Sequence, residues 1–218
     1  MPKVFIKRAS EVLIAFGVLI LLGALAILIK TSYEDANADE HARQTVEQLR
    51  ENIYEQPNSS ISGTESVDNH KDLAEKNNIN KSSGQSSSKE AVVVIDGTGY
   101  LGYLSFTGYG KVLPVLADWS FENLQYAPAR FSGSVIDNNL VIAAHNYFSH
   151  FYLLNEMTEG NEVILTLPDG KEIHYIVDKI ERLSPTELDK LTAGDYDLTL
   201  FTCTPTGLAR TTVRCNKI

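Results

Sequence analysis

The chain has 218 residues, 43% hydrophobic and 22% charged, so it can bury the core of one sizeable domain. Its formal net charge of −9 argues against a nucleic-acid partner, because phosphate binding requires a basic face. The two cysteines, Cys203 and Cys215, are too few for a disulfide scaffold and do not form a zinc-binding pattern, and we expect no metal and no cofactor.

The first predicted element is a membrane-spanning helix over residues 12–29, which contain no charged side chain. At about 1.5 Å per residue this run extends roughly 27 Å, close to the ~30 Å hydrocarbon core of a bilayer. Basic residues precede the run and acidic residues follow it, so residues 1–11 are expected in the cytoplasm and the rest of the chain outside the cell. The alternative is a cleaved signal peptide, because small-x-small patterns occur at residues 24–26 and 36–38.

Residues 30–90 are predicted to form an extracellular helix followed by a flexible spacer. Apolar residues such as Leu49 and Ile53 recur at helical spacing over residues 33–56, which predicts a weakly amphipathic helix that projects from the membrane. Residues 57–90 are rich in Ser, Asn, Gly and Lys and lack aromatic residues, so they cannot bury enough apolar surface to become ordered.

From residue 91 the sequence changes to short β-rich runs separated by turns. About eight such runs within residues 91–218 predict a mainly β domain, a closed or nearly closed barrel.

Turn and cap residues predict the connections between the strands. Asp169-Gly170 predicts a two-residue type I′ hairpin between neighbouring strands. The Ser-Pro-Thr-Glu sequence at 184–187 has the pattern of a helix cap and predicts a short helix over residues 184–191. A second short helix is predicted over residues 151–157.

One strand, DLTLFTC at residues 197–203, ends in a cysteine. Strand alternation places Leu198 and Leu200 on one face and Cys203 on the other, just before a loop that contains Pro and Gly. A thiol at this position is a candidate nucleophile, because a nearby imidazolium or guanidinium favours the thiolate. The alternatives are that Cys203 is a small buried side chain or forms a disulfide with Cys215, although the alternation argues against the disulfide.

The five histidines differ in their positions relative to the predicted strands. His145 follows an apolar strand at a strand-to-loop junction, where polar side chains reach clefts, and His150 is equally plausible on chemistry alone. His174, inside a strand, is predicted to be solvated or paired across strands. His41 and His70 are predicted to be passive.

The TLFTC sequence at residues 199–203 resembles the TLxTC signature of sortases, the membrane-anchored cysteine transpeptidases of Gram-positive bacteria. Three further segments resemble family segments in the same order, namely residues 100–105, residues 141–146 with their histidine, and residues 210–214 with their arginines. The resemblance extends over about residues 94–218. It implies a closed, eight-stranded sortase-type β-barrel with short helices, preceded by the transmembrane helix and the polar spacer.

The resemblance also implies a role for individual residues. Cys203 corresponds to the nucleophile, His145 to the acid/base partner, and Arg210 to the cation that holds the substrate backbone and the developing oxyanion; no metal ligand is implied. Thr202 is expected to shape the substrate groove. Arg214 is a rival for Arg210, because it lies on the same strand face and the loop after Cys203 is shorter than is usual in the family. Ala144 replaces the glycine that usually precedes the histidine, which adds one methyl group and leaves the chemistry in place.

The implied reaction is cleavage of an LPxTG-like, C-terminal sorting signal through a thioacyl-enzyme, followed by transfer to a cell-wall or pilin amine. The implied partners are secreted proteins with sorting signals, the amine acceptor and the membrane. The resemblance is to a B- or D-like enzyme rather than a typical class C enzyme, because no DPW-like lid motif precedes the domain and no second apolar segment follows it. The alternatives are a membrane-tethered cysteine endopeptidase that hydrolyses its substrate and a non-catalytic β-barrel surface module.

Overall fold

The computed structural model describes residues 2–55 and 90–218. In the first of these ranges the side chains are described from Phe16 onward, except at residues 31, 34–37 and 55. Nearly all of the predicted spacer, and His70 with it, therefore lies outside the described residues.

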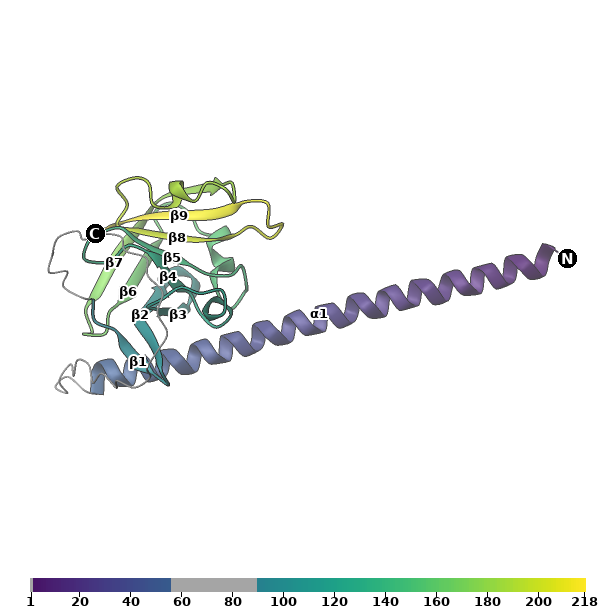
Figure 1. Ribbon diagram of the computed structural model, residues 1–218, viewed down its shortest axis with the longest axis horizontal. Coiled ribbons are helices and arrows are strands. Elements are labelled where there is room, and N and C mark those ends of the chain that lie inside the picture. Colours follow the sequence, from purple (N-terminus) through teal and green to yellow (C-terminus); the bar gives the residue numbers. More distant parts are fainter. Residues whose placement is uncertain (1, 56–89) are drawn as a thin grey trace, which may run out of the picture.

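The N-terminal part of the chain forms one continuous helix, α1 (Pro2–Glu55), which extends well beyond the rest of the molecule (Figure 1). The helix predicted over residues 33–56 is confirmed, and it continues directly from the apolar run. Within the described residues, no helix reaches the length and hydropathy that crossing a membrane requires. The predicted membrane segment, residues 12–29, begins among residues whose side chains are not described.

The C-terminal half of α1 packs against the β domain. Val46, Leu49 and Ile53 are buried in a cluster with Tyr103, and the Arg50 guanidinium lies 5.5 Å from the centre of the Tyr103 ring. Burial of each large apolar side chain contributes roughly 1.5–3 kcal/mol. The apolar stripe of this helix is therefore covered by the barrel.

Nine strands form one sheet in the order β1-β2-β3-β4-β5-β8-β9-β7-β6, and the pairing of β6 with β2 closes the strands from β2 to β9 into a barrel. The predicted closed, eight-stranded barrel is confirmed, with β1 as an additional strand beside β2. The strands are β1 (Val93–Ile95), β2 (Thr98–Phe106), β3 (Lys111–Leu116), β4 (Ala129–Ser132), β5 (Leu140–Ala143), β6 (Glu162–Thr166), β7 (Glu172–Leu183), β8 (Leu198–Cys203) and β9 (Arg210–Lys217).

The connections contain four short 3-10 helices, η1 (Thr107–Tyr109), η2 (Asn123–Gln125), η3 (Phe151–Asn155) and η4 (Asp189–Leu191). The helix predicted over residues 151–157 is confirmed as η3. The helix predicted over residues 184–191 is wrong, because only its last turn is helical. The Pro185 carbonyl, which the first turn of a regular helix would use, accepts a hydrogen bond from Arg210.

The hairpin between β6 and β7 is confirmed, but its predicted turn type is wrong. The Leu167 amide donates to the Lys171 carbonyl at 2.9 Å, so the loop has three residues, 168–170. Pro168 fixes a negative φ at the first loop position, and only Gly170, with φ of 79°, is left-handed. A type I′ turn would require positive φ at two successive positions.

The two faces of β8 belong to different apolar clusters. Leu198 and Leu200 are fully buried in the main core inside the barrel, whereas Phe201 packs in a second cluster with residues such as Leu183 and Leu191. The predicted alternation of this strand is thus confirmed. Cys203 lies on the face of Phe201 and points away from the barrel interior.

Candidate active site

The pairing of three adjacent strands brings His145, Cys203 and Arg210 to one edge of the sheet. Strands β5 and β8 are parallel, and the Ala144 amide donates to the Phe201 carbonyl at 3.2 Å, so both strands end at the same level. In the antiparallel pair of β8 and β9, Cys203 lies directly opposite Arg210. The edge therefore presents a thiol between an imidazole and a guanidinium.

The two cysteines have opposite environments, and both are free thiols. Cys203 is exposed, whereas Cys215 is fully buried in the main core, opposite Leu198 at the far end of the same strand pair. Burial raises the pKa of the Cys215 thiol to about 12, so it carries no thiolate at neutral pH. Both alternatives for Cys203, a disulfide with Cys215 and a buried side chain, are excluded in this structure.

His145 is half-buried at the start of the loop that follows β5. Its ring stacks on Tyr147, with ring centres 4.9 Å apart and planes inclined by 24°. Burial lowers the pKa of the imidazole below its ordinary value of 6.5, so the neutral ring dominates at neutral pH. A neutral imidazole can accept a proton from a thiol and return it to a leaving group, as an acid/base partner must.

Two of the other described histidines, His150 and His174, are engaged elsewhere. His150 is completely buried, and its Nε2 lies 3.2 Å from the Tyr126 carbonyl oxygen. His174 pairs with Glu162 on the neighbouring strand, with 2.8 Å between Nδ1 and Oε1, which confirms the predicted cross-strand pairing. Neither histidine lies on the edge formed by β5, β8 and β9.

The two arginines of β9 are held in different ways. Arg214 is only 2% exposed; its Nε donates to Glu181 at 2.9 Å, and its Nη1 donates to the Leu191 carbonyl at 2.7 Å. Arg210 is half-buried, donates to the Pro185 carbonyl and lies 5.9 Å from the centre of the Phe201 ring. Among the described residues no carboxylate pairs with Arg210, so its charge is available at the edge, whereas the charge of Arg214 is neutralised in the interior.

Thr202 is buried behind the site. Its hydroxyl group donates to the Ala144 carbonyl at 2.9 Å, immediately before His145, and its exposed fraction is 1%. Its role as a substrate contact stays a prediction; the observed contact fixes the position of the His145 backbone instead.

The loop between Cys203 and Arg210 is closed by hydrogen bonds at its base. The Thr204 amide donates to the Ala209 carbonyl at 2.8 Å, and the Thr204 hydroxyl accepts from the Ala209 amide at 3.2 Å. These bonds keep the short loop compact and hold Arg210 opposite Cys203.

Sequence reasoning missed two residues behind this edge, Asn155 and Thr211, which are joined by a hydrogen bond of 2.7 Å. Alternation in the strand at 210–215 offered a signal, because it places Thr211 on the same face as Val213 and Cys215. A hydroxyl group on a core-facing position requires a partner, and that partner is Asn155.

Aromatic side chains continue from the site across the outer face of the sheet. Phe131 on β4 packs edge-on against Phe201, with ring centres 5.3 Å apart, and Trp119 packs edge-on against Phe131 at 5.8 Å. Phe121 extends this row at 4.9 Å from Trp119 and is 78% exposed. The row forms an apolar wall that leads to the Arg210 side of the site.

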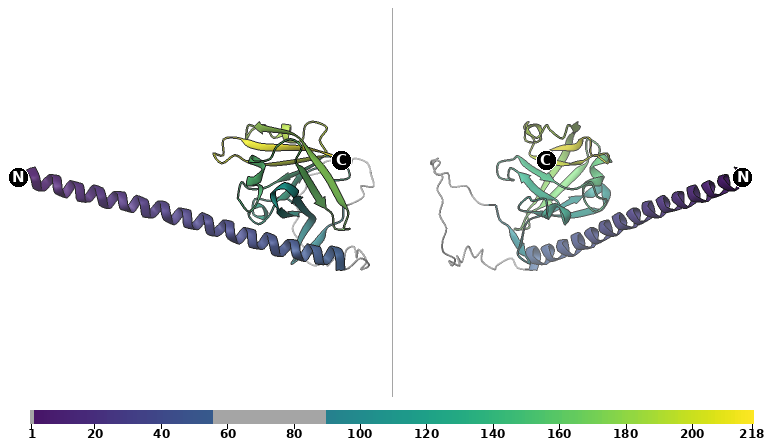
Figure 2. Two further views of the ribbon diagram at one scale, coloured as in Figure 1. Left: turned by 180° about the vertical axis from the view of Figure 1, so that it is seen from behind. Right: turned by 45° about the vertical axis from the view of Figure 1, so that its right-hand side comes forward.

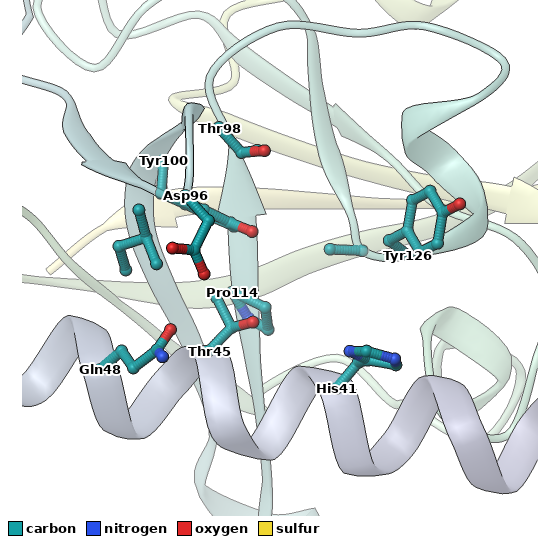
Figure 3. Close-up of a pocket in the computed structure, with 10 residues that line it drawn as sticks. His41, Thr45, Gln48, Asp96, Thr98, Tyr100, Pro114 and Tyr126 are labelled. Atoms are coloured by element: carbon teal, nitrogen blue, oxygen red, sulfur yellow. The ribbon is translucent and has the colours of Figure 1, made fainter.

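A pocket on another part of the molecule lies between α1 and the strands β1 to β3 (Figure 3). Its lining includes His41, Gln48, Asp96, Tyr100 and Tyr126. None of the residues at the edge of β5, β8 and β9 contributes to it. Within the described residues, no three His, Cys, Asp or Glu side chains gather in a way that could hold a metal ion.

Comparison with known proteins identifies one family. Residues 107–218, just over half of the chain, match the family described as Sortase domain. The chain is similar to sortase C1 from Streptococcus agalactiae, with 27% identity, coverage of 57% of this chain and 70% of that chain, and a TM-score of 0.51. It is also similar in fold to sortase A from Corynebacterium diphtheriae, with 24% identity, coverage of 56% and 61%, and a TM-score of 0.50.

A Clostridium perfringens sortase C with the C-terminal cell wall sorting motif matches with 26% identity, coverage of 55% of this chain and 70% of that chain, and a TM-score of 0.48. No curated protein sequence matches the chain. The class suggested by the sequence, B- or D-like, stays a prediction.

Proposed function

This chain belongs to the sortase family of cysteine transpeptidases, and on that premise we propose that it cleaves an LPxTG-like sorting signal in secreted proteins and joins the new acyl group to a cell-wall or pilin amine. The observation that carries the proposal is the edge formed by β5, β8 and β9. There an exposed free thiol lies on the strand between the one that leads to His145 and the one that begins with Arg210.

Cys203 is the nucleophile of this proposal. A cysteine transpeptidase requires one reactive thiol, and the chain has only two cysteines. Cys215 is fully buried with a pKa raised to about 12, so a peptide cannot reach it. Cys203 is therefore the only thiol in the sequence that combines access to a substrate with neighbouring polar groups.

The first half of the reaction forms a thioester. His145 accepts the proton of the Cys203 thiol as the sulfur attacks the carbonyl carbon of the scissile threonine, and the electrons of the carbonyl π bond move to oxygen and form an oxyanion. Collapse of this intermediate breaks the bond between carbon and nitrogen, and His145 donates a proton to the leaving amine. The products are an acyl group on Cys203 and a free amine.

The second half transfers the acyl group to the acceptor. The incoming amine attacks the thioester carbonyl, and His145 accepts the proton that the amine loses as the new amide forms. The bond between carbon and sulfur breaks, and the leaving sulfur takes this proton from His145, which restores the Cys203 thiol and the neutral imidazole. A half-buried imidazole with a lowered pKa suits this return step, because its neutral form is abundant at neutral pH.

Arg210 stabilises the oxyanion in this mechanism. Its guanidinium lies opposite Cys203, is oriented by the Pro185 carbonyl, and carries a positive charge that no described carboxylate neutralises. A fixed cation where negative charge develops lowers the barrier more than a mobile one does, because no reorganisation is needed during the reaction. Trp119 and Phe131 provide an apolar surface for the uncharged residues of a sorting signal.

The test uses the full-length chain in detergent micelles with LPxTG-like and NPxTN-like peptides and an amine acceptor, analysed by mass spectrometry. We expect a ligated peptide whose mass includes the acceptor and excludes the residues after the scissile bond. Free acid alone, in the presence of excess amine, would favour the hydrolytic endopeptidase. If no peptide gives either the ligated product or the free acid, the proposed substrate class is contradicted.

We also propose that residues 12–29 anchor the protein in the cell membrane, with residues 1–11 in the cytoplasm and the catalytic domain outside. Large apolar side chains between Phe16 and Ile29 are exposed at successive positions, with Leu21 at 70% and Leu22 at 61%. Successive helix residues are about 100° apart, so these side chains surround the helix. A helix that is apolar on all sides is stable only in an apolar surrounding, and lipid supplies one.

This anchor holds the catalytic edge close to the lipid. The first described residue of α1 buried beyond the apolar run is Ala38, nine residues after Ile29, which corresponds to about 14 Å of helix. Figures 1 and 2 show that the loop between β8 and β9, in yellow, lies at the end of the barrel directed toward the N-terminal half of α1. The site would therefore face sorting signals that emerge from the membrane.

The proposed topology predicts labelling of intact cells by a membrane-impermeant maleimide. Cys203 is expected to react, because it is exposed on the outer side, and the protein is expected in the membrane fraction after alkaline extraction. Cys203→Ala is the matched control and should not be labelled, since Cys215 is buried. Recovery of the protein in the soluble fraction would contradict the anchor.

A further inference from the structure

Two buried threonines lie side by side behind the catalytic edge. Thr202 on β8 is paired with Thr211 on β9, and both are at most 2% exposed. Cys203 and Arg210 form the next pair along the same strands, and alternation directs them to the opposite face. The side chains of the two threonines are therefore directed away from the face that carries Cys203.

The Thr211 hydroxyl connects β9 to the loop that carries His145. It donates to Oδ1 of Asn155 at 2.7 Å. The Asn155 amide donates in turn to Oδ1 of Asn146 at 2.8 Å and to the Tyr152 carbonyl at 2.9 Å. Asn146 directly follows His145, so two side chains span the distance from the strand of Arg210 to the neighbour of His145.

This position requires a side chain with both a hydrogen-bond donor and an acceptor, and the Asn155 amide provides both. Its oxygen accepts from Thr211, and its nitrogen uses its two hydrogens on Asn146 and Tyr152. A leucine of similar size has neither group, and an aspartate has no donor. The hydrogen-bonding pattern therefore specifies an asparagine or a residue with the same groups.

Two further hydrogen bonds hold the backbone of the loop on either side of the imidazole. Thr202 fixes the Ala144 carbonyl at 2.9 Å, and the Phe151 amide donates to the His145 carbonyl at 3.2 Å. The contact of Asn155 with Asn146 is the one that fixes the residue beyond His145 through its side chain. Because it leads back to β9, it couples the position of His145 to the position of Arg210.

We propose that Thr211 and Asn155 are positioning residues that hold the His145 loop against β9, so that His145 and Arg210 keep a fixed spacing on the two sides of Cys203. This role rests on the proposed function, in which both residues act on one substrate carbonyl. Neither positioning residue touches the substrate. Their effect is confined to the alignment of groups that react, and misalignment of about 1 Å can cost on the order of a hundredfold in rate.

The test compares Thr211→Val and Thr211→Ser in the full-length chain. Valine keeps the shape and removes the hydroxyl, so the turnover number is expected to fall about tenfold to a hundredfold while KM stays within about twofold. Serine keeps the hydroxyl and is expected to recover most of the turnover. Asn155→Leu should lower the turnover number about as much as Thr211→Val does. The double variant should turn over no more slowly than the less active of the two single variants, because both substitutions remove the same connection.

Thr212→Val is the matched control. Thr212 is the next residue on β9 and is fully buried, and among the described residues its hydroxyl has no hydrogen-bond partner. Its replacement should leave turnover unchanged. A loss at Thr212→Val as large as at Thr211→Val would overturn the proposal, because general disturbance of β9 would then explain both.

A second measurement is independent of any substrate. The ring resonances of His145, assigned by their disappearance in His145→Gln, are followed by NMR over a pH titration. We expect Thr211→Val and Asn155→Leu to shift these resonances and their titration midpoint, and Thr212→Val to leave them in place. Resonances that do not move in Thr211→Val overturn the positioning role even if no peptide is ligated, which separates this proposal from the proposed function.

Discussion

Replacement of Cys203 by alanine is expected to abolish ligation, with a loss on the order of 10⁴-fold or more in kcat/KM. The covalent route requires a thiol that a peptide can reach, and Cys203 is exposed at the end of β8. No other group can replace it, because Cys215 is fully buried at the far end of the strand pair. The measurement is the rate of ligated product by mass spectrometry, together with a search for the mass of the acyl-enzyme.

Cys215→Ala is the control for this prediction. It removes a thiol of the same chemistry from the core and should keep turnover within about twofold while it costs on the order of 1 kcal/mol of folding stability. Cys203→Ala should show the reverse, with stability nearly unchanged, because its side chain packs little. Ligation by Cys203→Ala, or its loss in a folded Cys215→Ala, would contradict the assignment of the nucleophile.

Local sequence pattern predicted most of the barrel because its strands are marked by their own residues. The alternation in β8 separates core residues such as Leu200 from Cys203 without knowledge of any partner strand. Strand β4 (Ala129–Ser132) has no such pattern, because it has only four residues, and it is paired with β3 only through Leu116 and Ala129. Its extended conformation depends on neighbouring strands that the local sequence does not identify.

The segment after Ser184 shows that a local pattern can be present without the element that it predicts. The capping contact suggested by the sequence exists, since Glu187 accepts from the Ser184 amide at 2.8 Å. The helix does not follow, because Arg210, 25 residues away, takes the Pro185 carbonyl as an acceptor. A contact at such separation has no local signature, and it decided the conformation.

The site residues were nominated by motif and then placed by topology. The sequence does not reveal that β5 and β8 are parallel neighbours, and this pairing brings His145 beside Cys203. The docking of α1 on Tyr103 was likewise hidden, because an amphipathic stripe indicates a buried face and not its partner. The sequence also does not reveal that Arg214 is a structural residue, because its hydrogen-bond acceptors come from three separate segments that only the fold brings together.

Arg214→Ala and Arg210→Ala are expected to have different large effects. Arg214→Ala should lower the folding stability, and Arg210→Ala should lower the catalytic rate. Arg214 is buried and pairs with Glu181 at 2.9 Å, so its removal leaves Glu181 paired with Lys179 alone and takes a donor from the Leu191 carbonyl. Loss of one partner of a buried pair costs about 3–5 kcal/mol. Arg210 is half-buried and unpaired with any described carboxylate, so Arg210→Ala should cost little stability but about 10²- to 10³-fold in kcat/KM.

Chemical denaturation and steady-state ligation, measured on both variants, separate these outcomes. Partial burial would by itself raise the pKa of Glu181, but hydrogen bonds from Lys179 and Arg214 lower it overall, so the pair stabilises the fold above the ordinary carboxyl pKa and loses this effect in acid. Glu181→Gln should restore only a small part of the stability lost in Arg214→Ala, because Lys179 still pairs with the Glu181 carboxylate at 2.9 Å. A folded but inactive Arg214→Ala beside a fully active Arg210→Ala would transfer the catalytic role to Arg214.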